Sequence, residues 1–168
     1  MPGRAIGIKL NLGYPGSVTR SGGGDPVIAS RVSAGEIPFG APVYLNADNS
    51  VVLFGAGSTA ARFMGFAVRI VKQPQSVFET VGGYRDGELS DVLTRGAVCV
   101  AFNGVGTPTA GGSVYVRTAL NSTFPNSQIG DVEAAADGTN TVLLTNATFT
   151  TGEVVDGVVE VTVNERRV

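Results

Sequence analysis

Residues 92–118 have the sequence VLTRGAVCVAFNGVGTPTAGGSVYVRT and indicate the fold class of the chain. They contain three short runs of strand-forming residues, at Val92–Thr94, Ala97–Phe102 and Val114–Thr118. β-Branched and aromatic residues of this kind are enriched in strands. The intervening Thr107–Gly112 is rich in glycine and proline, which are typical of tight turns. The stretch therefore predicts three β-strands joined by turns.

The same alternation of strand-like runs and turns continues on both sides of this stretch. Further strands are predicted at Val27–Val32, Val43–Asn46, Val51–Phe54, Phe66–Lys72, Ser76–Val81, Val132–Ala136, Val142–Thr145, Ala147–Thr150 and Val158–Val163. Val132–Ala136 also fits one helical turn, because alanine and glutamate favour helix. Many short strands with Gly-rich turns predict an all-β chain, either a single compact β-barrel or a jelly-roll-like sandwich, since these arrangements hide most strand edges.

The N-terminal part of the chain differs from the rest. Ile6–Leu12 alternates strictly between apolar and other residues and predicts a strand. In Gly13–Pro26, glycine and proline are too dense for a helix or a central strand. A long loop of this kind is uncommon in a compact domain and often functional. We therefore expect an extended arm over residues 1–26, which contacts a partner or is simply a flexible terminus, and a barrel or sandwich domain over 27–168.

Composition excludes several classes of function. The chain has 168 residues, a formal net charge of −2, one cysteine and no histidine. Without histidine, the chain lacks the usual general base and the commonest metal ligand. The charge balance offers no basic surface for phosphates, and no stretch reaches the ~18 apolar residues of a membrane-spanning helix. We expect no nucleic-acid partner, no membrane span and, since no signal peptide is visible, synthesis in a cytosol.

One motif has the form of a cofactor site. Gly55-Ala56-Gly57-Ser58-Thr59-Ala60 follows the apolar run Val51–Phe54 and matches G-x-G-x-x-A. A dinucleotide-binding turn needs a helix that starts at these glycines and a parallel strand after it. The following residues instead reach Gly65 and a β-branched run within two helical turns. We therefore interpret the motif as a Gly-rich turn between two strands, with nucleotide binding at Gly55 and Gly57 as the alternative, and expect no cofactor.

Other candidate chemical groups have simpler interpretations. Asp86, Glu88 and Asp91 could hold calcium, but the rest of a coordinating pattern is missing and Arg85 neutralises part of the cluster. A turn with solvated acids is the preferred interpretation. Cys99 occupies an alternating strand position and needs no role beyond apolar packing. The sequence thus predicts no catalytic residue and no metal site.

The basic residues are unusual in type. Ten of the twelve are arginine, and only Lys9 and Lys72 are lysine. Arginine is favoured at protein interfaces, where its planar guanidinium can bridge carboxylates or carbonyl oxygens. This bias is typical of an interaction protein, although a GC-rich genome produces it as well.

A set of short motifs follows one another in order along most of the chain. These are GYPGSVTR at Gly13–Arg20, Ile37-Pro38-Phe39-Gly40, Phe63-x-Gly65-x-Ala67-Val68-Arg69, Gly83-Tyr84 leading to Asp91-Val92-Leu93-x-Arg95-Gly96, and Gly112-x-Val114-Tyr115-Val116-Arg117. In this order and spacing the motifs resemble the capsid cement, or decoration, proteins of tailed bacteriophages.

This resemblance implies a non-enzymatic virion protein, made in the cytoplasm of the bacterial host, that binds the outer surface of an icosahedral head. Its partners would be the major capsid protein, whose subunits it would bridge, and copies of itself. A trimer is favoured over a dimer, because local threefold positions suit closed cyclic symmetry. The predicted contact residues are Tyr14, Pro15, Gly16, Arg20, Arg69 and Arg117. The alternative is a phage tail, fibre or baseplate module that contacts a receptor or carbohydrate.

Overall fold

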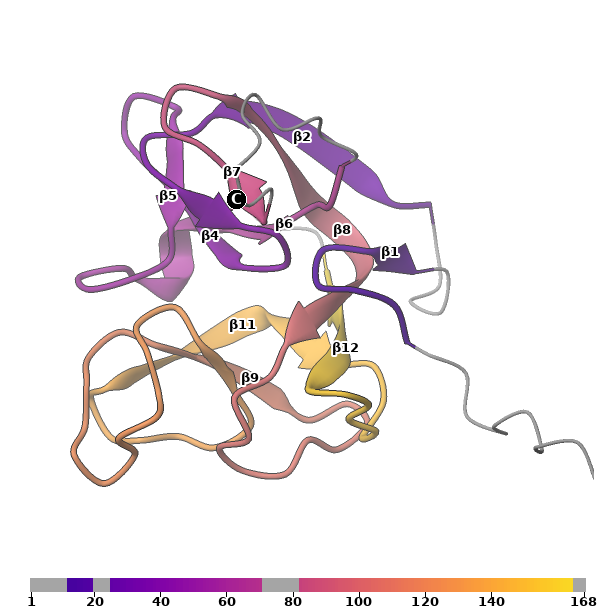
Figure 1. Ribbon diagram of the computed structural model, residues 1–168, viewed down its shortest axis with the longest axis vertical. Coiled ribbons are helices and arrows are strands. Elements are labelled where there is room, and N and C mark those ends of the chain that lie inside the picture. The colour runs from indigo at the N-terminus through magenta and orange to yellow at the C-terminus, as the bar shows by residue number, and fades with distance from the viewer. Residues whose placement is uncertain (1–11, 20–24, 71–81, 165–168) are drawn as a thin grey trace, which may run out of the picture.

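The computed structural model describes residues 12–19, 25–70 and 82–164 of the chain (Figure 1). In these ranges the chain forms strands and one turn of 3-10 helix, η1 (Ala60–Arg62). The strands are β1 (Val18–Thr19), β2 (Val27–Val32), β3 (Ile37–Pro38), β4 (Pro42–Leu45), β5 (Val51–Leu53), β6 (Phe63–Ala67), β7 (Gly83–Tyr84), β8 (Leu89–Ala101), β9 (Ser113–Arg117), β10 (Val132–Glu133), β11 (Thr141–Phe149) and β12 (Val158–Val163). The predicted all-β class is confirmed.

Ten of the strands form one large antiparallel sheet. Its order is β10-β9-β11-β12-β8-β6-β4-β5, and β1 and β2 also pair with β8. Figure 1 shows this sheet folded into two halves, with β2, β4, β5 and β6 in one half and β9, β11 and β12 in the other. Among the described residues the order of the paired strands does not close on itself, and only the single bridges Ser33–Val51 and Phe102–Val132 link its two ends back to the chain. The fold is therefore sandwich-like rather than a closed barrel, which decides between the two predicted architectures.

The long strand β8 joins the two halves because it belongs to both. Its first part pairs with β2 and β6, and its second part pairs with β1 and β12. Gly96 lies where the partners change and has a φ of +123°, a conformation that glycine adopts without strain. The sequence predicted two strands here, Val92–Thr94 and Ala97–Phe102. They are one strand, because Gly96 bends the chain without ending its ladder of hydrogen bonds.

The main apolar layer lies between the two halves of the sheet. It combines side chains of β6 and β8 with those of β9, β11 and β12. Three phenylalanines, Phe54, Phe63 and Phe66, form a row in this layer. The ring centroids of Phe54 and Phe63 are 6.1 Å apart and those of Phe63 and Phe66 are 5.3 Å apart, both in edge-to-face geometry. Such pairs stabilise the layer beyond the burial of their area.

A second apolar layer covers the opposite face of β4, β6 and β8. It contains Val43, Met64 and Val92 from these strands, and Ile37 and Tyr84 from the small two-stranded sheet β3-β7. Successive strand residues point to opposite faces, so neighbouring residues enter different layers. One half of the sheet therefore has both faces buried, which explains its long runs of apolar sequence.

Several predicted strand boundaries hold, and one is displaced. Val27–Val32 and Val158–Val163 match β2 and β12. The predicted Phe66–Lys72 corresponds to β6, which begins earlier and ends at Ala67. The predicted range begins one residue after Gly65, which lies inside β6. Gly65 has a φ of +155°, and a Cβ on it would overlap the carbonyl oxygen of Leu93. Glycine is thus needed inside β6, where β8 approaches closely.

Other differences follow from contacts that are distant in sequence. The two runs Val142–Thr145 and Ala147–Thr150 form the single strand β11, which has an irregular register opposite β9. Val132–Ala136 is strand only over Val132–Glu133, and the helical alternative is not adopted. Strands β3 and β7 were not predicted, because their proline and glycine residues are typical of turns. Only Leu12 of the predicted strand Ile6–Leu12 belongs to the described residues. The predicted strand Ser76–Val81 lies wholly outside them.

Candidate functional site

Tyr14-Pro15-Gly16-Ser17 forms a tight turn next to the sheet. The amide of Ser17 donates a hydrogen bond of 2.9 Å to the carbonyl oxygen of Tyr14. Proline at the second position and glycine at the third, with a φ of +85°, are the residues that a type II turn requires. The sequence Tyr-Pro-Gly thus specifies this turn locally and leaves the Tyr14 ring at its outer corner.

The turn is fixed to the domain by backbone contacts on two sides. The amide of Gly16 donates to the carbonyl oxygen of Cys99 over 2.8 Å, and the carbonyl oxygen of Gly16 accepts from the amide of Arg69 over 2.8 Å. A Cβ on Gly16 would lie 2.7 Å from the Arg69 nitrogen, and one on Gly40 would lie 2.7 Å from the Gly16 nitrogen. The turn therefore packs so closely that glycine is required at both positions.

Within the predicted arm, Val18–Thr19 form strand β1 of the sheet, and the turn before them is bonded to it. β1 pairs with β8 in the register Val18 to Val98 and Thr19 to Ala97. The hydroxyl of Thr19 also bonds the Glu160 carboxylate on β12. The division of the chain at residue 26 stays a prediction, because residues 1–11 and 20–24 lie outside the described part. Arg20, one of the predicted contact residues, lies there too.

Tyr14 and Arg69 form one surface, which we call the Tyr14 surface and which lies over the Phe39 ring. The Tyr14 side chain is 63% exposed, and Arg69 is also exposed. The guanidinium carbon of Arg69 lies 5.2 Å from the centroid of the Tyr14 ring and 5.6 Å from that of Phe39, within the range of cation–π attraction. The sequence predicted Tyr14 and Arg69 separately, and the structure brings them together.

Phe39 was not predicted as a site residue and supports the Tyr14 surface from below. It is almost fully buried, and its ring meets the Tyr84 ring edge-to-face at 5.3 Å. The Tyr84 hydroxyl donates to the carbonyl oxygen of Val68 over 2.7 Å. Burial raises the pKa of Tyr84 to about 12, so this hydroxyl keeps its proton. Phe39 and Tyr84 therefore form a rigid aromatic support beneath Tyr14 and Arg69. The motif Ile37–Gly40 alone did not indicate this support.

Arg117, another predicted contact residue, lies elsewhere and is fully buried. Its Nε and Nη2 donate to the two carboxylate oxygens of Glu133 over 2.6 and 2.9 Å, and its Nη1 donates to Asp137 over 2.9 Å. These carboxylates, Glu133 first, raise the pKa of Arg117 above its ordinary value. Because the guanidinium has no exposed surface in the chain, we leave Arg117 out of the surface proposed below.

The Arg117 pair organises the loop between β9 and β10. Asn103 Nδ2 donates to Glu133 over 3.0 Å and to Asp131 over 3.1 Å, and Asn121 Nδ2 donates to Asp137 over 2.9 Å. The amide of Asn121 and then the guanidinium of Arg117 lower the pKa of Asp137. Buried charges are tolerated when they are paired and hydrogen-bonded in this way. The network thus holds residues 118–137 in their folded conformation.

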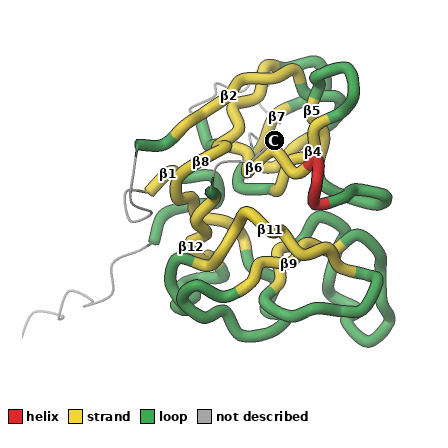
Figure 2. The backbone as a smooth tube through the Cα atoms, turned by 180° about the vertical axis from the view of Figure 1, so that it is seen from behind, coloured by secondary structure: helices red, strands yellow, loops and turns green. Residues whose placement is uncertain are grey.

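The Gly-x-Gly motif is a turn between strands, as the preferred interpretation predicted. After β5 the chain turns at Gly57, forms η1 and enters β6 (Figure 2, η1 in red). Both β5 and β6 pair antiparallel with β4. The motif therefore lacks the long helix and the parallel strand that a dinucleotide-binding turn uses.

The carboxylates of two acidic residues after β7, Glu88 and Asp91, accept hydrogen bonds from groups of the fold. The amide of Arg85 donates to a carboxylate oxygen of Glu88 over 2.8 Å, and Asp91 accepts from the Ser30 hydroxyl over 2.6 Å. Within the described ranges no group of three His, Cys, Asp or Glu side chains could hold a metal ion. No helix of the described chain is long and apolar enough to cross a membrane.

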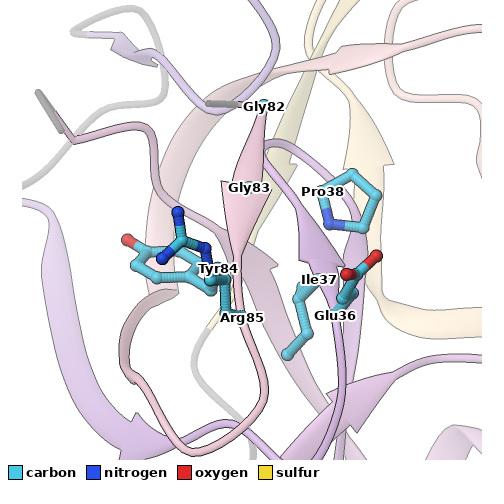
Figure 3. Close-up of a pocket in the computed structure, with 7 residues that line it drawn as sticks. All are labelled: Glu36, Ile37, Pro38, Gly82, Gly83, Tyr84 and Arg85. Atoms are coloured by element: carbon cyan, nitrogen blue, oxygen red, sulfur yellow. The ribbon is translucent and has the colours of Figure 1, made fainter. Parts of the chain in front are cut away.

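A hollow of about 370 Å³ lies beside the strand pair β3-β7. Figure 3 shows Arg85 next to the Tyr84 ring on one side of this pair, and Glu36 and Pro38 on the other side. Gly82 and Gly83 also line the hollow and present only backbone. The hollow thus offers two charges of opposite sign and no constellation for catalysis among its lining residues.

Comparisons with known proteins agree with this all-β fold. A family model described as Structural cement protein (E217 gp24/Pam3 gp6) matches residues 2–164. A chain in the solved structure entitled "The capsid of Myoviridae Phage XM1" has the same fold, with a TM-score of 0.70, 19% identity and 97% of each chain covered. No curated protein matches the chain.

The described residues form an all-β fold that the protein shares with a chain of a phage capsid structure. Because the family model spans nearly the whole sequence, the chain belongs to the phage structural cement protein family. The resemblance seen in the sequence motifs is confirmed. The chain is a structural protein of the phage capsid, and its family has a capsid-stabilising role.

Proposed function

We propose that this protein binds the outer surface of the head, bridges neighbouring subunits of the major capsid protein and acts without enzymatic activity. The observation that carries this proposal is the family match over residues 2–164. The Tyr14 surface supports it, because tyrosine and arginine are enriched among the residues that dominate binding energy at protein interfaces. We assign Tyr14, Pro15 and Arg69 to the capsid contact, and Gly16, which is buried, to the turn that positions them.

The rigidity of the Tyr14 surface favours binding. The turn is held by hydrogen bonds to two segments, and Phe39 and Tyr84 support it from inside. A side chain that is already ordered loses less conformational entropy when it binds. The contact of one copy can therefore be small and still be effective, since a capsid presents many equivalent positions.

The expected partners also include further copies of the chain. An icosahedral lattice has local threefold positions, and these suit a closed trimer ahead of a dimer. A trimer would place three Tyr14 surfaces on neighbouring capsid subunits at the same time. This state would explain how a small protein bridges subunits rather than binding to one of them.

Co-sedimentation with undecorated heads tests this function. Heads of the corresponding major capsid protein are mixed with the wild-type chain and with the variants Tyr14→Ala and Arg69→Ala. Leu120→Ala and Arg62→Ala are matched controls, because Leu120 is 69% exposed on another loop and Arg62 stacks on Tyr44 instead of Tyr14. We expect saturable binding of the wild type and controls, and weaker binding of the two Tyr14-surface variants.

The outcomes separate the candidate functions. Wild-type binding at a fixed ratio, with heads that then withstand more heat, supports the proposal. Equal binding by all four variants contradicts the assignment of the Tyr14 surface. A wild-type chain that does not bind mature heads contradicts the capsid role and favours the tail, fibre or baseplate alternative.

A further inference from the structure

Asn103 and Gly104 lie just after the end of β8 and form the only Asn-Gly pair in the sequence. In such a pair the backbone nitrogen of glycine can attack the side-chain amide of asparagine, because glycine has no side chain that hinders the approach. Gly104 is exposed and has a φ of +86°, and apart from its chain neighbours no atom lies within 4 Å of its Cβ position. The backbone at Gly104 is therefore sterically open.

The amide nitrogen of Gly104 is also free to react, since it donates no hydrogen bond to any described residue. Two competing asparagines, the exposed Asn49 and Asn126, are followed by serines. The amides of these serines, Ser50 and Ser127, each donate a hydrogen bond of 3.0 Å. A hydrogen-bonded amide loses its proton less readily and is a weaker nucleophile. The pair at residues 103–104 thus has the more reactive backbone.

Four hydrogen bonds hold the Asn103 side chain. Its Nδ2 donates to Ser127 Oγ over 3.2 Å, to Asp131 Oδ2 over 3.1 Å and to Glu133 Oε1 over 3.0 Å. Its Oδ1 accepts from the amide of Val105 over 3.1 Å. Attack by the glycine nitrogen expels Nδ2 as ammonia, so every hydrogen bond of Nδ2 must break. The network therefore restrains a reaction that the Asn-Gly sequence favours.

We propose that Asn103 is the residue at which the folded chain deamidates, and that the hydrogen bonds of its Nδ2 set the rate. The Gly104 nitrogen gives its proton to water and forms a bond to Asn103 Cγ. The bond from Cγ to Nδ2 then breaks, and Nδ2 takes up a proton and leaves as ammonia. Water opens the resulting succinimide ring at one of its two carbonyl carbons and gives aspartate or isoaspartate. No electrons are transferred, and water is the only co-reactant.

Either product disrupts the network around Arg117. A carboxylate at position 103 has no amide protons to donate, and it brings a third negative charge next to Asp131 and Glu133. Like charges so close repel each other, and acceptors that lose their donor away from water are costly. Isoaspartate also inserts a methylene group into the main chain that bridges to β10. Deamidation should therefore loosen residues 118–137, which this network holds.

Mass spectrometry of the full chain tests the site and its control by the fold. The folded wild type is incubated at mildly alkaline pH, beside the same chain unfolded in guanidinium chloride and the folded variants Asp131→Ala and Glu36→Ala. Asp131→Ala removes one acceptor of Nδ2, whereas Glu36 is exposed and lies outside the network. Peptide digestion locates the mass increase that accompanies exchange of an amide for a carboxyl group. We expect conversion first at Asn103, at least about tenfold faster in the unfolded chain. Asp131→Ala should also react faster than the wild type, and Glu36→Ala should not.

The variant Asn103→Asp tests the effect of the product. We expect its melting temperature to lie roughly 5 °C or more below that of the wild type. Asn126→Asp is the matched control, because Asn126 is exposed and gains the same charge at a solvated position. It should melt close to the wild type. Equal melting of Asn103→Asp and the wild type would contradict the effect assigned to deamidation.

The rates decide the proposal. Conversion first at Asn103, slower in the folded wild type than in the unfolded chain and in Asp131→Ala, supports it. First conversion at another asparagine, or none at Asn103 in the folded chain after the unfolded chain has fully reacted, overturns the site. Equal rates in the folded wild type, the unfolded chain and Asp131→Ala overturn the control by hydrogen bonds.

Discussion

Gly65 shows how a single residue limits the sequences compatible with this fold. Its backbone lies against the Leu93 carbonyl group, and its φ is +155°. We expect Gly65→Val to lower the free energy of unfolding by about 3 kcal/mol or more, because the side chain would force β6 away from β8. Gly57→Ala is the control, since Gly57 also has a positive φ but no atom lies near its Cβ position. Chemical denaturation should show a much smaller loss for the control, and equal losses would contradict the steric argument.

Arg117 illustrates a residue whose role depends on a distant partner. We expect Glu133→Gln to lower the free energy of unfolding by about 3–5 kcal/mol, because it leaves the buried Arg117 charge without its bidentate partner. The double variant Arg117→Met, Glu133→Leu should be more stable than Glu133→Gln, since it removes both charges. Urea denaturation measures all three chains. A double variant that is the least stable would show that the charges themselves are indispensable.

Asp137 links the same network to pH. Its folded pKa is below its unfolded value of about 3.8, first because of Asn121 and then because of Arg117. A carboxyl with a lowered folded pKa contributes stability above the unfolded pKa and loses it as pH falls through the folded pKa. We therefore expect the wild type to lose stability below about pH 4 more steeply than Asp137→Asn. Melting temperatures between neutral pH and acid measure this, and parallel curves would contradict the role of Asp137.

At the scale of elements, the described part of the arm and strand β8 stabilise each other through direct contacts. β1 and the Tyr14–Ser17 turn bond the second part of β8, and the Cys99 thiol contacts the carbonyl oxygen of Leu12. Removing residues 1–25 should therefore lower the melting temperature as well as head binding. Removing residues 1–11 keeps every one of these contacts and should leave the melting temperature close to that of the wild type.

Cys99 reports on this docking directly. Burial raises its pKa to about 11, so the thiolate that reacts with disulfide reagents is scarce at neutral pH. We expect faster labelling of Cys99 in the chain without residues 1–25 than in the chain without residues 1–11. Equal labelling rates would show that residues 12–19 do not protect β8.

The sequence predicted elements well where local signals decide them. Val27–Val32 and Val158–Val163 carry strand-forming residues between clear turns, and Tyr14-Pro15-Gly16 specifies its own turn. The predicted strand bounds left out Gly65 and Gly96, because glycine has the same local signature whether it ends a strand or permits a close approach. Both differences have one cause. Contacts of β8 decide whether a strand continues through the glycine, and these contacts join residues that lie far apart in the sequence.

The same limit applies to the candidate site. Tyr14 and Arg69 were predicted from the motifs, but their contact across the Gly16 turn depends on the folded chain. Arg117 was predicted as a contact residue, because its partner Glu133 is sixteen residues away and no local pattern shows that β9 and β10 pair. Phe39 lay in a motif that the sequence singled out, yet its support of Arg69 required the tertiary structure.

At the scale of the whole molecule, the small size of the Tyr14 surface is compatible with a large effect on the head. A net charge of −2 provides little long-range attraction, so attachment depends on contacts made at short distance. Each bound copy stabilises only the capsid subunits that it contacts, so the stability of the head grows with the number of occupied positions. Stabilisation of the head should therefore follow occupancy closely.

This dependence predicts a recoverable defect for Tyr14→Ala. The side chain is exposed and its ring is not part of the apolar layers, so the variant should keep its fold. We expect roughly tenfold weaker binding to heads, equivalent to about 1.4 kcal/mol per contact. At limiting protein the variant should leave the heads heat-sensitive, whereas a proportionate excess should restore both occupancy and heat resistance by mass action. Differential scanning calorimetry of heads at several protein ratios measures this, and heads that stay sensitive at full occupancy would show that Tyr14 acts beyond attachment.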